Sequence, residues 1–114
     1  MAIKISSTPV RITVELSGEI DHHNAAALRL ETDEAIQKVL APNVRLDFGE
    51  VTFMDSSGIG LVMGRYAKMK TIGGELVLRG ANERLMRIFK MAGLERIVRI
   101  EETDEEEENE GERN

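Results

Sequence analysis

The sequence contains no cysteine and no tryptophan, and its 114 residues include only one tyrosine, three phenylalanines and two prolines. The absence of cysteine excludes a disulfide framework, a thiolate zinc site and a cysteine nucleophile, and it is compatible with a reducing compartment. Aromatic side chains are scarce although 41% of the residues are hydrophobic, so the core must be mainly aliphatic. The length is typical of a single domain.

Long apolar runs are also missing from the chain. No segment approaches the roughly 20 apolar residues that a membrane-spanning helix needs. The first four residues, Met-Ala-Ile-Lys, do not open a signal peptide. These absences predict a cytoplasmic protein with no membrane partner.

Charge is divided unevenly along the chain. The formal net charge is -6, but residues 101–114 carry nine acidic side chains and one basic one, so residues 1–100 are slightly positive. A block of like charges without large apolar side chains cannot bury enough surface to offset its ordering entropy. We therefore predict one folded domain over residues 1–100 and a flexible acidic tail over residues 101–114, which serves solubility or covers a basic partner.

Hydrophobic periodicity predicts alternating strands and helices. The expected strands lie at residues 3–5, 10–16, 44–48, 75–79 and 97–100, with a break at Gly49-Glu50. The expected helices lie at residues 25–40, 57–72 and 82–93. This order favours a single α/β layered domain in which helices pack against a mixed, mostly parallel sheet with one antiparallel strand at the front.

The predicted helices each show one apolar stripe, which we expect to be buried. The stripes are Leu28, Ala35, Ile36, Val39 and Leu40; Ile59, Val62, Met63, Tyr66 and Met69; and Leu85, Ile88, Phe89 and Ala92. The loops at residues 18–24, 55–60 and 80–83 each follow a strand and precede a helix. In an open α/β sheet such loops gather at the carboxyl edge, where ligands usually bind.

The most informative of these loops is Asp55-Ser56-Ser57-Gly58, at the start of the second predicted helix. The first backbone N–H groups of a helix lack intrahelical partners, so Asp or Ser oxygens accept hydrogen bonds from them. The positive end of the helix dipole also tolerates a phosphate. Local chemistry alone favours plain capping over a phosphorylation site.

Catalytic and metal sites find little support in the sequence. A serine hydrolase needs a base, and the candidates are the adjacent His22 and His23, with no nucleophile elbow around Ser56. The two histidines lack a third nearby metal ligand, and solvent-exposed loop residues are the simpler interpretation. Asp21 and Asp55 each occupy the position of a helix N-cap rather than of a magnesium site.

Nucleic-acid binding is also disfavoured. Arg84, Arg87 and Lys90 follow one face of the third predicted helix, with Arg96 and Arg99 beyond it. No aromatic residue interleaves with these cations to stack bases, and the acidic tail would oppose binding to phosphates. We interpret the basic stripe as a solvated helix face.

The residues around the serine loop favour a phosphorylation site over plain capping. Residues 53–66 (FMDSSGIGLVMGRY) closely resemble the phosphorylatable segment of bacterial anti-sigma factor antagonists, the founding members of the STAS domain family. Residues 18–23 (GEIDHH) resemble the other signature of that family, and residues 73–78 and 89–94 also match in order. The resemblance covers most of residues 3–100 and is strongest to the sigma-F type that acts in sporulation.

The resemblance implies a protein-interaction module rather than an enzyme, without a cofactor or metal. In this family the unphosphorylated antagonist binds an anti-sigma factor that is also a serine kinase, which releases the sigma factor. Phosphorylation by that kinase ends the interaction and a serine phosphatase restores it. The resemblance places the phosphate on Ser56, with Ser57 as second choice, and assigns partner binding to Asp21, His22, His23, Asp55, Ser56, Ser57, Gly58, Ile59 and Gly60.

Two alternatives stay open beside this reading. One is a STAS scaffold subunit of a stress-signalling complex, which lacks such a kinase partner. The other, from a different class, is a small serine-dependent hydrolase. The carboxyl terminus also departs from the family, because relatives close with a short helix, whereas residues from Glu101 onward are more acidic and less apolar than such a helix.

Overall fold

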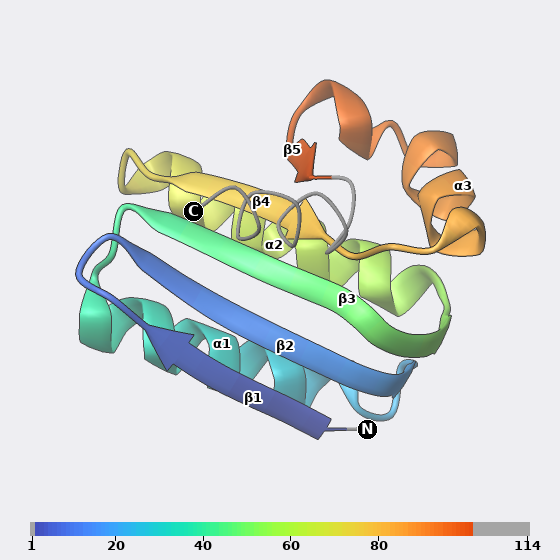
Figure 1. The fold of residues 1–114 in the computed structure, drawn as a ribbon, viewed down its shortest axis with the longest axis horizontal. Coiled ribbons are helices and arrows are strands. Elements are labelled where there is room, and N and C mark those ends of the chain that lie inside the picture. Colours follow the sequence, from blue (N-terminus) through green and yellow to red (C-terminus); the bar gives the residue numbers. More distant parts are fainter. Residues whose placement is uncertain (1, 102–114) are drawn as a thin grey trace, which may run out of the picture.

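The computed structural model describes residues 2–101, which form five strands and three α-helices (Figure 1). The strands are β1 (Ala2–Ser7), β2 (Arg11–Ile20), β3 (Asn43–Met54), β4 (Glu75–Arg79) and β5 (Arg99–Glu101). The helices are α1 (Ala25–Val39), α2 (Ser56–Thr71) and α3 (Glu83–Met91), followed by a 3-10 turn at Leu94–Arg96.

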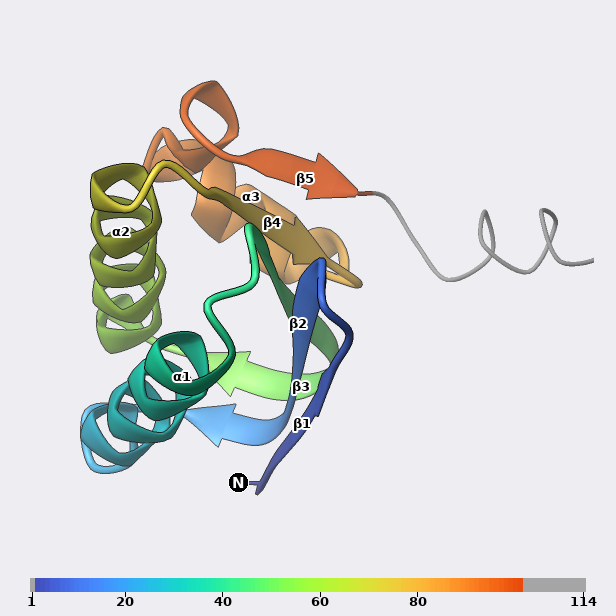
Figure 2. The ribbon, with the colours of Figure 1, turned by 90° about the vertical axis from the view of Figure 1, so that its left-hand side faces the viewer.

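The strands form one sheet in the order β1-β2-β3-β4-β5. β1 is antiparallel to β2, and every other neighbouring pair is parallel. α1 and α2 lie side by side on one face of this sheet (Figure 2). The α/β fold with a mixed, mostly parallel sheet that the sequence predicts is confirmed.

β2 and β3 are longer than predicted. The glycine at position 18 was expected in a loop, and Gly49-Glu50 was expected to end a strand, yet both strands continue beyond these residues. The β2–β3 register shifts between Glu15 and Ser17 and again between Gly18 and Glu19, and Gly18 takes a positive φ of 80°. Such irregularities bend a strand without ending it, so the local glycine signal was misleading.

The α1 stripe is partly as predicted. Leu28 and Ile36 are fully buried. Leu40 is 69% exposed, because it adopts the left-handed conformation (φ 55°) that ends the helix. Thr32, which the apolar pattern missed, is buried because its hydroxyl donates a 2.7 Å hydrogen bond to the carbonyl of Leu28.

The α2 stripe is rotated from the predicted one. Val62 and Met69 are buried as expected, but Met63 is 41% exposed. Gly58, Leu61 and Arg65 are buried instead. The hydrophobic pattern did not predict this buried face, because a glycine and an arginine give no hydrophobic signal.

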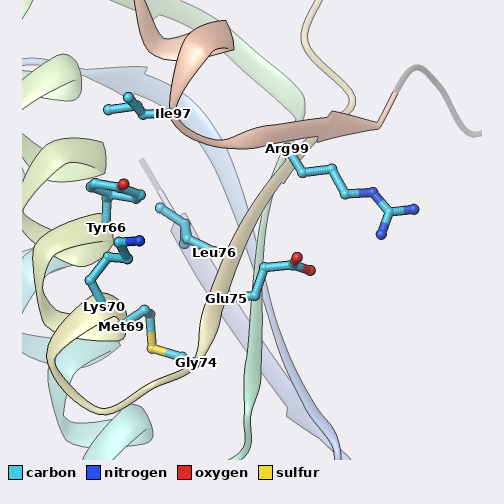
Figure 3. Close-up of a pocket in the computed structure, with 8 residues that line it drawn as sticks. All are labelled: Tyr66, Met69, Lys70, Gly74, Glu75, Leu76, Ile97 and Arg99. Carbon is cyan, nitrogen blue, oxygen red and sulfur yellow. The ribbon is translucent and has the colours of Figure 1, made fainter.

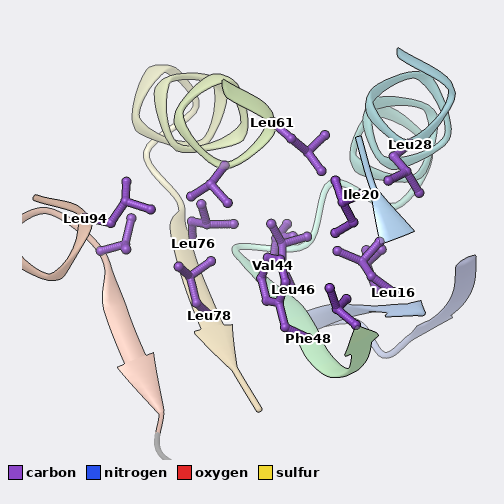
Figure 4. Packing of buried hydrophobic residues seen from close by; sticks show 14 of the residues in the cluster. Leu16, Ile20, Leu28, Val44, Leu46, Phe48, Leu61, Leu76, Leu78 and Leu94 are labelled. Atoms are coloured by element: carbon purple, nitrogen blue, oxygen red, sulfur yellow. The ribbon is translucent and has the colours of Figure 1, made fainter. Parts of the chain in front are cut away.

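The core is aliphatic, as the shortage of aromatic residues requires. Side chains from β2, β3, β4, α1, α2 and α3 form one cluster (Figure 4). Its two phenylalanines, Phe48 of β3 and Phe89 of α3, meet edge to face with ring centroids 5.3 Å apart. This contact holds α3 to the sheet. In α3, Leu85 is buried as predicted, whereas Ala92 is exposed.

The boundary of the predicted tail falls inside the last strand. Glu101 is the final residue of β5, and its Oε1 lies 3.0 Å from Nε of Arg45. Residues 102–114 lie outside the described residues, so the flexible tail stays a prediction. Within residues 2–101, no helix has both the length and the apolar character needed to cross a bilayer.

We expect the two glycines of the first α2 turns to respond in opposite directions to alanine. At Gly58 an added Cβ would overlap Cγ of the buried Met54, so Gly58→Ala should lower the free energy of unfolding by about 1–3 kcal/mol. At Gly60 an added Cβ meets nothing within 4 Å. Gly60→Ala should therefore stabilise the protein by about 0.5–1 kcal/mol. Urea denaturation of both variants is the measurement, and equal effects would contradict the packing described here.

Candidate interaction site

The ends of β2 and β3 bring two distant segments together. Ile20 and Met54, the last residues of these parallel strands, are partners in the register. The backbone N–H of Asp55 donates a 3.1 Å hydrogen bond to the carbonyl of Ile20. The GEIDHH segment and the serine loop therefore lie side by side, as their places after parallel strands predicted.

The third predicted loop does not join them. Gly80 follows β4, which ends at Arg79, the register partner of Asp47. A Cβ at Gly80 would lie 2.9 Å from the backbone nitrogen of Gly49. Gly80 is thus beside the middle of β3, while Asp55 follows its end. The expectation that residues 80–83 share the edge with the other two loops is wrong, because β3 continues past β4.

Asp55 caps α2. Its backbone is extended (φ -102°, ψ -170°), and its Oδ1 accepts a 2.8 Å hydrogen bond from the N–H of Ser57. Its carbonyl accepts a 3.0 Å bond from the N–H of Gly58. Ser56 is exposed, and within residues 2–101 no hydrogen bond engages its hydroxyl. Asp55 therefore caps the helix, and the hydroxyl of Ser56 does not contribute to the cap.

Asp21 caps the turn that leads into α1. Its Oδ1 accepts hydrogen bonds from the N–H groups of His23 (2.9 Å) and Asn24 (3.2 Å). In return, Oδ1 of Asn24 accepts a 3.0 Å bond from the N–H of Asp21. This reciprocal pair is a capping box in which Asn24 takes the place of the usual Glu or Gln. The N-cap of α1 itself is Asn24, whose side chain makes no capping bond to the helix, so Asp21 caps the preceding turn and not, as predicted, the start of the helix.

The two histidines are exposed and stacked on each other, with ring centroids 4.5 Å apart and planes inclined by 24°. The carboxylate of Asp21 is directed at backbone amides, and among residues 2–101 no hydrogen bond links it to either imidazole. Among the described residues, no three His, Asp or Glu side chains gather as metal ligands. The histidines thus form one exposed surface next to the serine loop.

A hollow of about 340 Å³ separates the first turns of α1 and α2. It is lined by His22, Ala25, Ala26, Arg29, Ser57, Gly60 and Leu61. Ser57, which lines the hollow, is half-buried, whereas Ser56 is exposed. Arg29 was not predicted here. No local sequence signal marks it, because its place in the hollow depends on the packing of α1 beside α2.

The other predicted site residues differ in how far they are exposed. Gly58 is buried against Met54 and Ile59 is half-buried, whereas Gly60 is exposed. Gly58 therefore offers little surface to a partner, and its visible role is close packing. Phe53, just before the loop, is 45% exposed. An exposed aromatic side chain beside a polar loop is a common feature of protein-binding surfaces.

A partly buried ion pair joins α1 and α2 one helical turn beyond the hollow. Nε of Arg65 lies 2.9 Å from Oδ1 of Asp33, and Nζ of Lys68 lies 3.7 Å from the same oxygen. The Arg65 and Asp33 atoms are close without being aligned as a hydrogen bond. Burial lowers the pKa of Arg65, Asp33 acts in the opposite direction, and the nearby charge of Arg29 lowers the pKa further.

A second hollow, of about 240 Å³, lies near the other end of α2 (Figure 3). Tyr66 and Lys70 border it from the helix, and Nζ of Lys70 is 6.0 Å from the centroid of the Tyr66 ring. Glu75 and Arg99 extend away from Tyr66, and Glu75 accepts a 2.9 Å hydrogen bond from the side chain of Asn43. None of the predicted site residues lines this hollow.

Comparison with known proteins agrees with the geometry of the two loops. The family model described as the STAS domain matches residues 2–107. The chain belongs to the STAS domain family. It is 39% identical over 89 residues to an anti-sigma F factor antagonist from Paenibacillus polymyxa, an alignment that covers 78% of this chain and 76% of the relative.

Further relatives point the same way. The chain is 35% identical over 89 residues to an anti-sigma-B factor antagonist from Bacillus subtilis, covering 78% of this chain and 80% of the relative. The solved structure of the anti-sigma factor antagonist SpoIIAA in its unphosphorylated form superposes with a TM-score of 0.80 at 28% identity, covering 98% and 96% of the two chains. The phosphorylated form from Bacillus gives 0.75, covering 96% and 97%.

The capping box predicts how the STAS domain responds to changes at Asp21. Asp21→Ala removes the acceptor for two N–H groups and should lower the free energy of unfolding by about 1 kcal/mol. Asp21→Asn retains an acceptor oxygen and should unfold within a few tenths of a kcal/mol of wild type. Urea denaturation measures both. If Asp21→Ala is as stable as wild type, Asn24 alone holds the turn.

Proposed function

We propose that this protein is an anti-sigma factor antagonist whose binding is switched off by phosphorylation of Ser56. Relatives with this fold bear that name. We choose Ser56 because two neighbouring side chains have different roles at the start of α2. Asp55 caps the helix, while Ser56 is exposed and its hydroxyl is not engaged within the described residues. A kinase can reach this hydroxyl without disturbing the fold.

The partner is an anti-sigma factor with serine kinase activity, and a serine phosphatase reverses the modification. In the unphosphorylated state, the exposed loop, the two stacked histidines and Phe53 offer a mixed polar and apolar surface. A phosphate adds about -1.5 to -2 charges beside Asp55 and Asp21. Repulsion and the cost of desolvating this charge at the interface then oppose binding.

The hydrolase alternative gains little support from the geometry. His22 and Ser57 border the same hollow, but no hydrogen bond joins them among the described residues. Asp21 accepts hydrogen bonds from backbone amides rather than orienting an imidazole. A base and its orienting carboxylate are thus not assembled. The alternative of a scaffold subunit shares the same fold and differs only in having no kinase partner.

The decisive experiment incubates wild type, Ser56→Ala and Ser57→Ala with the cognate anti-sigma kinase and ATP, then locates phosphate by peptide mass spectrometry. We expect phosphate on Ser56 in wild type and Ser57→Ala, and none in Ser56→Ala. Ser56→Ala should still fold and bind the kinase, because Asp55 retains the cap. Phosphate on Ser57, or none on any variant with an active kinase, would contradict the assignment; in the second case the scaffold alternative gains.

Charge at position 56 should move folding and binding in opposite directions. Ser56→Asp places a carboxylate at the first turn of α2, where the helix dipole favours it by about 0.3–1 kcal/mol. The variant should therefore unfold no more easily than wild type, while its affinity for the anti-sigma factor falls. Ser56→Asn is the matched neutral control, measured by urea denaturation and calorimetric titration. Tight binding by Ser56→Asp would refute a switch based on charge.

Asp21→Asn separates the cap from the interface. It retains the capping oxygen but removes the charge beside the serine loop. If the carboxylate contacts the partner, this variant should bind the anti-sigma factor more weakly than wild type at equal stability. Equal binding and equal phosphorylation would show that Asp21 acts only as a cap.

A further inference from the structure

The hollow between α1 and α2 begins one helical turn from the proposed phosphorylation site. On a helix, residues four apart are neighbours on the same face, so Ser56 is next to Gly60 and Ser57 is next to Leu61. Gly60 and Leu61 both line the hollow. A Cβ at Gly60 would meet nothing within 4 Å. Ser57, the residue after Ser56, also lines the hollow, so Ser56 lies at the edge of the hollow.

The opposite wall of the hollow carries the positive charge of Arg29. Arg29 projects from α1, and His22 precedes the helix. On α1 the natural partner of Arg29 would be Asp33, four residues later. However, Asp33 pairs with Arg65 at 2.9 Å and with Lys68 at 3.7 Å. Within residues 2–101, Arg29 consequently makes no ion pair.

The carboxylates closest in sequence to the hollow are engaged elsewhere. The carboxylates of Asp21 and Asp55 accept hydrogen bonds from backbone amides at the starts of the two helical segments. One turn along α2 from Leu61, Nη1 of Arg65 is buried without a hydrogen-bond partner among the described residues, and the positive charges of Arg65 and Arg29 repel each other. The hollow therefore combines uncompensated positive charge with room for an anion.

We propose that Arg29, assisted by His22, binds the phosphate of phosphorylated Ser56 within the same molecule. This inference rests on the proposed function, because it assumes phosphate at Ser56. A guanidinium presents two parallel N–H donors that match two phosphate oxygens, and such charge-assisted pairs are stronger than neutral hydrogen bonds. Phosphorylation then does more than add negative charge: it also withdraws Arg29 from any partner that approaches the loop.

The test installs phosphoserine at position 56 during translation, so that no kinase is needed. ³¹P NMR then measures the second pKa of the phosphate in wild type and in Arg29→Gln. Arg29→Gln removes a positive charge that favours the dianion, so it should raise the pKa of the phosphate by about half a unit. Gln is a good helix former at an exposed position, and α1 should persist.

Two further variants make the result specific. Arg84→Gln removes an equal charge from the exposed face of α3 and should leave the pKa of the phosphate as in wild type. Arg29→Lys keeps the charge but loses the planar fork, so its value should lie between those of wild type and Arg29→Gln. The proposal is overturned if Arg29→Gln matches wild type, or if Arg84→Gln shifts the phosphate as much as Arg29→Gln does.

This measurement is independent of the proposed function. A kinase assay that places phosphate elsewhere would refute Ser56 as the natural site, while the ³¹P titration would still report whether Arg29 contacts a phosphate there. Conversely, phosphorylation of Ser56 with no effect of Arg29→Gln would preserve the switch and remove the intramolecular contact.

Discussion

β2 and β3 pair in parallel over most of their length, and Ile20 and Met54 end them at the same level. The hydrogen bond from Asp55 to the carbonyl of Ile20 continues this pairing by one residue. Each strand then turns into a helix, so the caps of α1 and α2 are set side by side. The candidate interaction surface, the hollow between α1 and α2 and the position of the serine loop all depend on this one alignment.

Packing below the loop keeps that alignment rigid. Gly58 lets the first turn of α2 approach Met54 closely, and the ion pair between Arg65 and Asp33 joins α2 to α1. Neither contact was visible in the hydrophobic pattern. A glycine contributes no apolar signal, and a buried arginine reads as a surface residue until its partner on another helix is known.

The sequence predicted the element order and most helix bounds, because capping residues and glycines mark helix ends locally. Asn82, for example, accepts a hydrogen bond from the N–H of Leu85 at the predicted start of α3. The strand ends predicted from the sequence were wrong where the length of a strand depends on pairing with its neighbour. Gly18 and Gly49 look like strand ends, but pairing between β2 and β3 carries both strands past them. The serine loop and Asp21 were recognisable from local chemistry, whereas Arg29 became visible only when α1 lay beside α2.

The cap supplied by Asp55 would allow one molecule to pass through repeated cycles of the proposed phosphorylation. Because the helix start does not depend on the hydroxyl of Ser56, that position can gain and lose a phosphate while the backbone around it keeps its hydrogen bonds. No segment has to melt or refold between the two states. Under the proposed phosphorylation of Ser56, the rate of a signalling cycle would be limited by the enzymes that act on the loop rather than by the conformational kinetics of the domain, and repeated cycles would not pass through an aggregation-prone intermediate.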